Sequence, residues 1–212
     1  MLVSPAKENI LKKIRQALVN PTPVPFPQSE GNSSVYIPEK QDLEIEFAEN
    51  FGLVQGRFIF CADIEEMTGQ VKQLIGQNGW TQVFCRETSF LQFLSGPLKG
   101  LLISDEIQEA DVSITGCEML VARTGSILMS SAQESGRLAS VYAPVHICIA
   151  YTNQLVYDVR DGLEALSEKY KNQMPSFITL ATGPSRTADI EKTLVVGVHG
   201  PKQVYVFLVD AG

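Results

Sequence analysis

The chain has 212 residues, 44% of them hydrophobic and 19% charged, and is therefore long enough for a medium-sized domain with a substantial core. Its formal net charge of −7, without any lysine- and arginine-rich run, disfavours a general binder of nucleic-acid phosphates. No apolar run approaches the roughly 20 residues of a membrane span, and the first residues lack the apolar core of a signal peptide. We therefore expect a cytoplasmic protein that contacts neither nucleic acid nor membrane.

The first 40 residues predict a helix followed by a tether. Ser4-Pro5 is typical of a helix start, and an apolar stripe follows at helical spacing in Ile10, Leu11, Ile14 and Leu18. Four prolines between residues 21 and 27 then predict an extended, semi-rigid segment. We expect an N-terminal helix over residues 1–20, a proline-rich linker over 21–39 and an α/β domain over 40–212. The apolar stripe packs either on that domain or on a partner.

Strand and helix patterns alternate in the next part of the chain. Asp63 and Glu66 have the spacing of a capping pair, and Gly79 is placed to end the helix that they begin. The elements predicted from periodicity are helices over 41–53, 64–78 and 88–94 and strands over 57–61, 82–86 and 101–104. Such alternation favours a parallel sheet that is covered on both faces.

The middle of the chain contains more closely spaced strands. Strands are predicted over 111–115 and 126–130, with one or two helical turns over 117–122 between them. One or two further strands are expected within 139–150, broken at Pro144, and a long helix is expected from Leu155 to before Pro175. Because short connections favour antiparallel pairing, we expect the sheet to be mostly parallel but mixed.

A polar, glycine-containing segment lies between the last two predicted strands, 177–181 and 204–209. It reads Thr182-Gly183-Pro184-Ser185-Arg186-Thr187-Ala188-Asp189-Ile190-Glu191, and a second turn follows at Gly197-Val198-His199-Gly200-Pro201. Gly183 is suited to a positive φ, and Ser185 or Thr187 can cap a helix that starts at Ala188. Unpaired N–H groups at that helix start, together with the Arg186 guanidinium, would attract an anion.

These residues and a second turn supply the candidate site. We expect ligand contacts from Thr182, Gly183, Ser185, Arg186, Thr187, Gly200, Thr124 and Gly125. The catalytic residues stay unknown, with Asp189, Glu191 and His199 as candidates for moving protons. The alternative is architectural, since the same residues can form a capped turn with an arginine–carboxylate pair. His146 lies in an apolar run and is expected to be a core residue.

The four cysteines, Cys61, Cys85, Cys117 and Cys148, contain no C-x-x-C pair, and three of them lie in apolar β-type runs. Buried, reduced thiols are the expected reading. With only two histidines in the chain, we expect no metal site and no bound cofactor.

The T-G-P-S-R-T-A-D-I-E and G-V-H-G-P segments resemble the signature of the lactate-utilisation protein C family, the LUD domain. The upstream block Asp111-Val112-Ser113-Ile114-Thr115-Gly116 and the stretch from Ala122 to Leu128 also resemble that family. Where the family is expected to read A-E-T-G, this chain has Arg123 in place of the acid. The resemblance implies a three-layer α/β/α fold like that of sugar-phosphate isomerases, glucosamine-phosphate deaminases and CoA transferases.

The resemblance also implies a function. It points to a component of L-lactate utilisation, in which lactate is oxidised to pyruvate together with iron–sulfur partner proteins. This chain would bind a small anionic ligand or a partner and would not carry the redox centre. Two alternatives stay open: a stand-alone enzyme acting on a phosphorylated sugar or CoA ester, and a non-catalytic sensor or scaffold. Whether the chain is itself an enzyme, and whether it forms a homo-oligomer, the sequence leaves open.

Overall fold

The computed structural model describes residues 5–19, 38–39, 41–103, 105–171, 173–190 and 193–211. By its internal contacts the chain divides into two units, residues 1–38 and 39–212. The described part of the first unit contains helix α1 (Pro5–Val19). No helix in the described ranges is both long enough and apolar enough to cross a membrane.

The second unit is built on a parallel sheet of six strands in the order β1-β12-β7-β4-β2-β3. These strands are β1 (Arg57–Cys61), β2 (Val83–Cys85), β3 (Leu102–Ile103), β4 (Val112–Thr115), β7 (Val145–Tyr151) and β12 (Gln203–Val209). Side chains alternate across this sheet, as the strand period of two requires. In β12, Tyr205 and Phe207 contribute to one core cluster, whereas Val204 and Val206 contribute to another on the opposite face.

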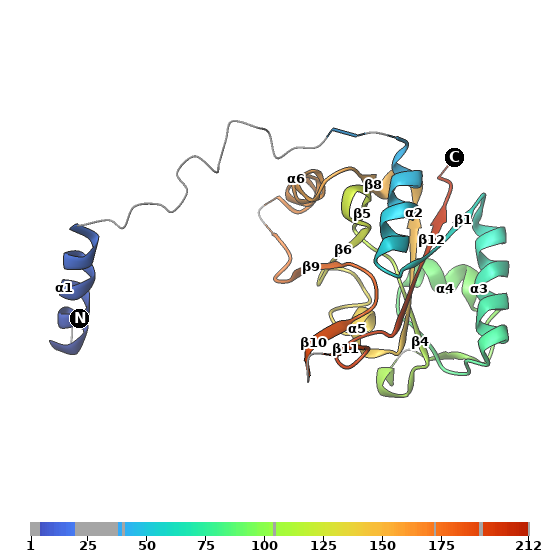
Figure 1. Ribbon diagram of the computed structural model, residues 1–212. Helices are drawn as coiled ribbons and strands as arrows, with labels where there is room; N and C mark the ends of the chain where they lie inside the picture. The colour runs from blue at the N-terminus through green and yellow to red at the C-terminus, as the bar shows by residue number, and fades with distance from the viewer. Residues whose placement is uncertain are drawn as a thin grey trace. The chain divides into compact units, whose positions relative to one another are not determined.

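Helices α3 (Ile64–Asn78) and α4 (Thr88–Leu94) cover the first face, to the right of the sheet in Figure 1. The predicted caps of α3 are confirmed: Asp63 Oδ1 accepts a hydrogen bond from the Glu66 backbone N–H at 2.8 Å, and Gly79 ends the helix with a φ of 67°. Met67, Val71 and Ile75 of α3 are buried, so the apolar stripe of this helix faces the sheet.

A second sheet of four strands and several helices cover the opposite face (Figure 1). Its order is β8 (Leu155–Val156), β5 (Met119–Val121), β6 (Ser126–Ser130) and β9 (Ile178–Ala181). Helix α2 (Leu43–Leu53) buries Phe47 and Phe51 in the core between the two sheets. Helix α6 (Val159–Tyr170) packs on β5 and β8, and the short α5 (Ala139–Tyr142) packs on β4 and β7.

The prediction of an α/β fold with a mostly parallel sheet surrounded by helices is confirmed. The expected antiparallel pairs exist, but they lie in the second sheet, where β6 pairs antiparallel with β5 and β9. The central sheet itself is parallel throughout the described residues.

Three local predictions for the middle of the chain, between residues 117 and 170, were wrong. Residues 119–121 form strand β5, since this apolar run pairs with β6 and β8, and only the 3₁₀ turn η2 (Ala122–Thr124) follows it. The stretch before Pro144 is helix α5, and one strand, β7, begins after that proline. The helix expected from Leu155 begins at Val159, because Asp158 caps it by accepting from the Arg160 N–H at 3.1 Å.

Candidate functional site

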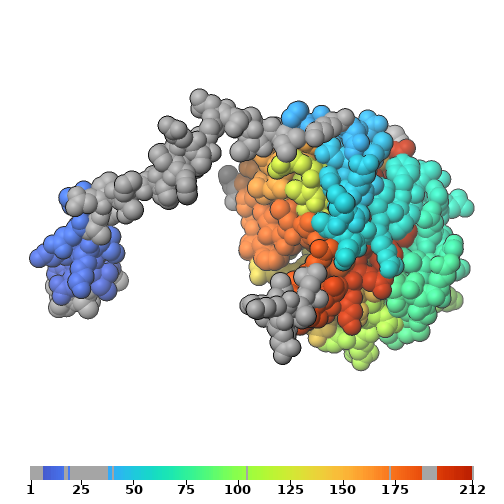
Figure 2. All heavy atoms as spheres, in the orientation of Figure 1, coloured from blue at the N-terminus to red at the C-terminus, as the bar shows by residue number. Residues whose placement is uncertain are grey.

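Residues 182–191, which we call the signature segment, begin with a turn that only glycine can make. Gly183 has a φ of 75°, as predicted, and a Cβ at this position would lie 2.2 Å from the carbonyl oxygen of Val54. The chain therefore passes directly against the end of α2. Figure 2 shows the same proximity, with the light-blue α2 residues meeting the orange-red residues of the signature segment.

The helix predicted from Ala188 was wrong. Residues 186–190 form strand β10 (Arg186–Ile190), which pairs antiparallel with β11 (Thr193–Val196). The capping signals were outweighed by β-branched residues, which favour a paired strand. Consequently the expected helix N-terminus, with its N–H groups free for an anion, does not form at this position.

The two glycine-containing turns of the signature lie against each other. The Gly197 N–H donates to the Ser185 carbonyl at 2.8 Å, and the Ser185 N–H donates to the Pro201 carbonyl at 2.9 Å. A Cβ at Gly200 would lie 2.8 Å from the Cβ of Ser185. The β10–β11 hairpin thus brings the turn at Gly183 and the turn at Gly200 into contact, and the glycine at residue 200 permits this close approach.

A cavity of about 190 Å³ lies beside this junction; we call it the signature cavity. It adjoins the starts of β7 and β12, helix α5 and strand β9. Its polar lining consists of Ser140, His146, Thr179, Ser185 and His199, together with the backbone of Gly183 and Gly200. Among the described residues, no arginine or lysine lines it. The remaining lining is mainly apolar, so the cavity suits a small ligand with few polar groups.

The two histidines occupy different positions in this cavity. His199 is exposed at the turn between β11 and β12. His146, on β7, has no exposed surface, and its Nε2 lies 2.8 Å from Thr115 Oγ1. Burial lowers the pKa of His146 to about 4, so its imidazole is neutral at neutral pH. The expectation of a buried His146 holds, but sequence reasoning did not place it beside the signature turns.

Of the predicted ligand contacts, Gly183, Ser185, Gly200 and the candidate base His199 meet at the signature cavity. Arg186 does not line it; this exposed side chain donates from Nη2 to the Val54 carbonyl at 2.7 Å. Asp189 lies in β10 by its backbone, and Glu191 lies outside the described residues.

Three of the remaining predicted contacts, Thr124, Gly125 and Thr182, lie where α2 meets the second sheet. The hydroxyls of Thr124, Ser126 and Thr182 form a chain with separations of 2.8 Å. Gly125 has a φ of 58°, and a Cβ there would lie 2.4 Å from the backbone nitrogen of Phe51. Packing of α2 accounts for this glycine. Thr187 pairs through its backbone with Val195 in the β10–β11 hairpin.

Arg123, at the position where the resemblance led us to expect an acid, forms an ion pair. Its Nε lies 2.5 Å from Oδ2 of Asp158, the residue that caps α6. Arg123 is one third exposed by its side chain and Asp158 is 11% exposed. The cation therefore joins η2 to the start of α6.

A second buried acid has a full set of partners. Glu118 accepts hydrogen bonds from Ser130 Oγ at 2.5 Å, Lys169 Nζ at 2.7 Å and Tyr170 Oη at 2.7 Å. Burial by itself would raise the pKa of Glu118, but these three donors outweigh it, so the pKa lies below its ordinary value. Sequence reasoning missed this cluster, whose members are up to 52 residues apart.

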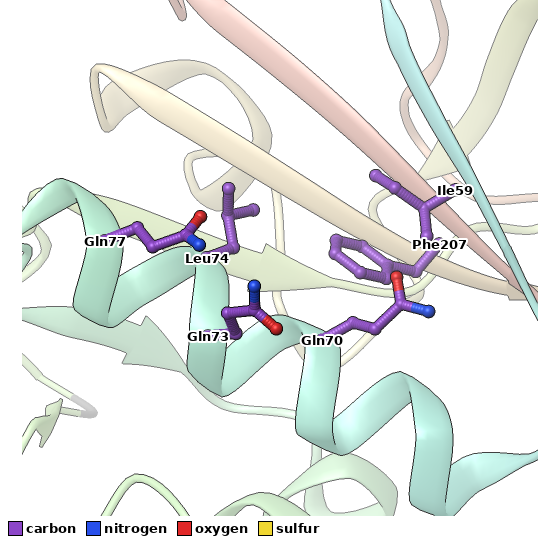
Figure 3. Close-up of a pocket in the computed structure, with 6 residues that line it drawn as sticks. All are labelled: Ile59, Gln70, Gln73, Leu74, Gln77 and Phe207. Atoms are coloured by element: carbon purple, nitrogen blue, oxygen red, sulfur yellow. The ribbon is translucent and has the colours of Figure 1, made fainter.

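Other cavities of the described residues lie outside the signature region. One, of about 240 Å³, is lined by Arg86 and Arg137, with Asp105 3.8 Å from Arg86. The other, of about 350 Å³, is a groove in which Gln70, Gln73 and Gln77 of α3 lie beside Leu74, across from Ile59 and Phe207 (Figure 3). Since this groove offers only amide groups around an apolar floor, it supplies no group for acid–base chemistry.

All four cysteines are buried free thiols, as expected. Burial raises the pKa of Cys61 to about 11 and that of Cys85 to about 12, so these thiols stay protonated at neutral pH. Within the described ranges, the histidines, cysteines and acids form no cluster of three or more that could hold a metal ion.

Comparison of the sequence with models of known protein families identifies the family of this chain. The model of the LUD domain matches residues 87–209, which is more than half of the chain. The chain belongs to the LUD domain family. The match includes β4, the signature segment and β12, and thus both turns that border the signature cavity.

Several curated proteins resemble this LUD domain chain. "Lactate utilization protein C" of Deinococcus radiodurans is 37% identical over 105 residues, 49% of each chain. The protein of the same name from Bacillus subtilis is 35% identical over 106 residues, 49% of this chain and 44% of the relative. "Uncharacterized protein YkgG" of Escherichia coli is 35% identical over 117 residues, 54% of this chain and 51% of that protein. The chain spans about half the length of the curated relatives it matches.

A solved structure shares the fold. The crystal structure of a DUF162 family protein from Deinococcus radiodurans matches with a TM-score of 0.58 at 23% identity, covering 79% of this chain and 96% of that one. At this identity the match supports the architecture.

Proposed function

We propose that this LUD domain protein is a component of L-lactate utilisation that binds a small monocarboxylate in the signature cavity. Relatives that carry the name lactate utilization protein C support the pathway. The protein acts in the cytoplasm beside iron–sulfur partner proteins and does not carry the redox centre itself. Its four cysteines are buried free thiols, which supports leaving the electron-transfer centre to a partner.

The observation that carries the ligand class is the lining of the signature cavity. It combines hydroxyls, two imidazoles and apolar side chains without an arginine or lysine among the described residues. A phosphate dianion or the phosphates of a CoA ester require several cationic donors. A monocarboxylate requires fewer, and the exposed His199 and the backbone at Gly183 and Gly200 can supply donors to it. The lining thus favours lactate or pyruvate over a sugar phosphate.

The experiment is a deletion of the gene in its native host, followed by growth on L-lactate and on glucose. We expect loss of growth on lactate alone, restored by the wild-type gene and not by a His146→Phe/Ser185→Val double variant that fills the cavity with apolar groups. A matched control is Gln73→Leu, which makes the same polar-to-apolar change in the α3 groove and should restore growth fully. Normal growth of the deletion strain on lactate would contradict the proposal.

A second experiment tests the alternative enzyme. The purified chain is assayed alone with sugar phosphates and CoA esters, and calorimetry measures its binding of L-lactate, pyruvate and inorganic phosphate. We expect monocarboxylate binding and no turnover. Co-purification of the tagged native protein with iron-containing proteins would support the partner role, whereas turnover by the isolated chain would replace it with the stand-alone enzyme.

A further inference from the structure

His146 has one ring nitrogen that is paired and one that is not. Its Nε2 lies 2.8 Å from Thr115 Oγ1 on the neighbouring strand β4. Its Nδ1 is buried and has no hydrogen-bond partner among the described residues. The same residue forms part of the wall of the signature cavity. Buried polar atoms in proteins are nearly always paired, so an unpaired nitrogen beside a cavity indicates a partner that comes from outside the chain.

The hydrogen bonds around Thr115 determine which nitrogen carries the proton. The Thr115 hydroxyl donates to the Gly116 carbonyl at 2.9 Å. A hydroxyl has a single hydrogen, so towards His146 it can only accept. Nε2 must therefore be the protonated nitrogen. Because the buried imidazole is neutral at neutral pH, Nδ1 has a free lone pair and acts purely as an acceptor.

An acceptor in the wall of the cavity selects for a donor on the ligand. A hydroxyl group can donate to Nδ1, whereas a carbonyl oxygen would bring a second lone pair against it and leave both acceptors without a proton. Sites built to bond a substrate hydroxyl discriminate strongly against analogues that lack it. The His146 ring has no exposed surface, so a ligand has to displace a lining side chain to reach Nδ1.

We infer that Nδ1 of His146 accepts a hydrogen bond from a hydroxyl of the bound ligand, so that the signature cavity takes a 2-hydroxy acid in preference to the corresponding 2-keto acid. The carboxylate of this ligand rests on the proposed function, whereas its hydroxyl rests on the geometry around Nδ1 alone. His146 is then a specificity-determining residue, and Thr115 is the positioning residue that fixes its tautomer.

The tautomer is tested first, on the full chain. Nitrogen-15 NMR of histidine-labelled protein at neutral pH reports which ring nitrogen of His146 is protonated, and His146→Phe assigns the signals. We expect Nε2–H and a lone pair on Nδ1. A protonated Nδ1 would overturn the inference, because that atom would then donate to a ligand carbonyl.

Binding then tests the preference. Calorimetry compares L-lactate with pyruvate, and glycolate with glyoxylate, on the wild-type chain and on three variants. We expect the hydroxy acid of each pair to bind at least tenfold more tightly to the wild type. His146→Phe should bring the ratio close to one, and Thr115→Val, which frees the tautomer, should reduce it. His199→Phe, at the mouth of the cavity, should weaken both members of a pair equally and keep the ratio. Equal affinities in the wild type would overturn the inference.

A neutral pair separates this inference from the proposed function. Isopropanol and acetone share the hydroxyl–carbonyl difference but lack the carboxylate, and each is titrated while the Nδ1 signal of His146 is followed. If isopropanol alone shifts that signal while neither lactate nor pyruvate binds, the hydroxyl hydrogen bond to Nδ1 stands, whereas the preference for a 2-hydroxy acid and the lactate role both fail. If none of these compounds moves the Nδ1 signal, the inference itself is wrong.

Discussion

At the scale of single residues, the buried carboxylate of Glu118 is a stabilising element whose effect depends on pH. Three donors hold its pKa below the ordinary value of 4.5. A carboxyl with a depressed folded pKa stabilises the protein fully above its unfolded pKa, and this stabilisation is lost as the pH falls through the folded pKa. Lys169, whose pKa the Glu118 hydrogen bond raises, keeps its contribution until the pH rises beyond 10.5.

We therefore expect Glu118→Gln to lower the free energy of unfolding at pH 7 by about 2 kcal/mol. The figure is moderate because the Lys169 side chain is 57% exposed and water screens the pair. Denaturant unfolding at a series of pH values should show that the difference in the free energy of unfolding between the variant and the wild type becomes smaller below about pH 4.5. The control is Glu168→Gln, which changes an exposed acid next to Lys169 on α6. Its free energy of unfolding should stay within about 0.5 kcal/mol of the wild-type value. A gap that is constant down to pH 3 would contradict this account.

Arg123 gives the second prediction at this scale. Replacing it with an acid would place a carboxylate against Asp158, which is mostly buried. We expect Arg123→Glu to cost about 2 kcal/mol, and Arg123→Ala about 1 kcal/mol because the pair is only partly shielded from water. Chemical denaturation of Arg123→Ala in the wild type and in an Asp158→Asn background, where residue 158 keeps a capping side chain but loses its charge, measures the coupling. If Arg123→Ala costs the same in both backgrounds, the ion pair is not what stabilises this turn.

At the scale of elements, the contact of α2 with the turn after η2 depends on glycine in two ways. Gly125 has a positive φ, and a Cβ there would also collide with the backbone of α2 at Phe51. Gly136 has a similar φ of 68° but open space around its Cβ position. The two glycines therefore separate backbone strain from close packing.

We expect Gly136→Ala to cost about 1–2 kcal/mol, the penalty for a left-handed alanine. Gly125→Ala should cost at least about 2 kcal/mol more, because backbone atoms 2.4 Å away cannot yield without moving α2. Urea titrations of both variants measure the difference, and near-ultraviolet circular dichroism reports any displacement of the aromatic α2 residues. Equal losses would mean that α2 shifts without cost.

The elements also show how far sequence reasoning reaches. Caps and periodicity located α3 and most strands, since Asp63, Glu66 and Gly79 act through local contacts. The same local signals failed at residues 186–190, where pairing with residues 193–196 outweighed the capping pattern. The signature turns were found because glycine and proline mark backbone geometry. The partners of Glu118 and the nearness of His146 to His199 were not found, because contacts between residues far apart in the sequence bring them together.

At the scale of the whole molecule, the core belongs to the second unit. Every residue of the four buried core clusters lies between Phe47 and Val209. The described part of the first unit is α1, whose Ile10 and Ile14 side chains are 59% and 48% exposed. We propose, in line with the boundaries expected from the sequence, that residues 40–212 form an independently stable domain and that residues 1–39 are an appended helix and linker.

This organisation predicts the behaviour of a truncated chain. Removing residues 1–38 should leave one cooperative thermal transition, with Tm within about 2 °C of the full chain, because no core cluster loses a member. The affinity for L-lactate should be unchanged, since the cavity residues lie between 140 and 204. Ile10→Ser/Ile14→Ser in the full chain is the matched variant, which removes the apolar stripe but keeps the length. If truncation and this variant both lower Tm by more than about 5 °C, the stripe packs on the domain itself. If Tm is unchanged while capture of iron-containing proteins by the tagged chain is lost in both, α1 serves a partner instead.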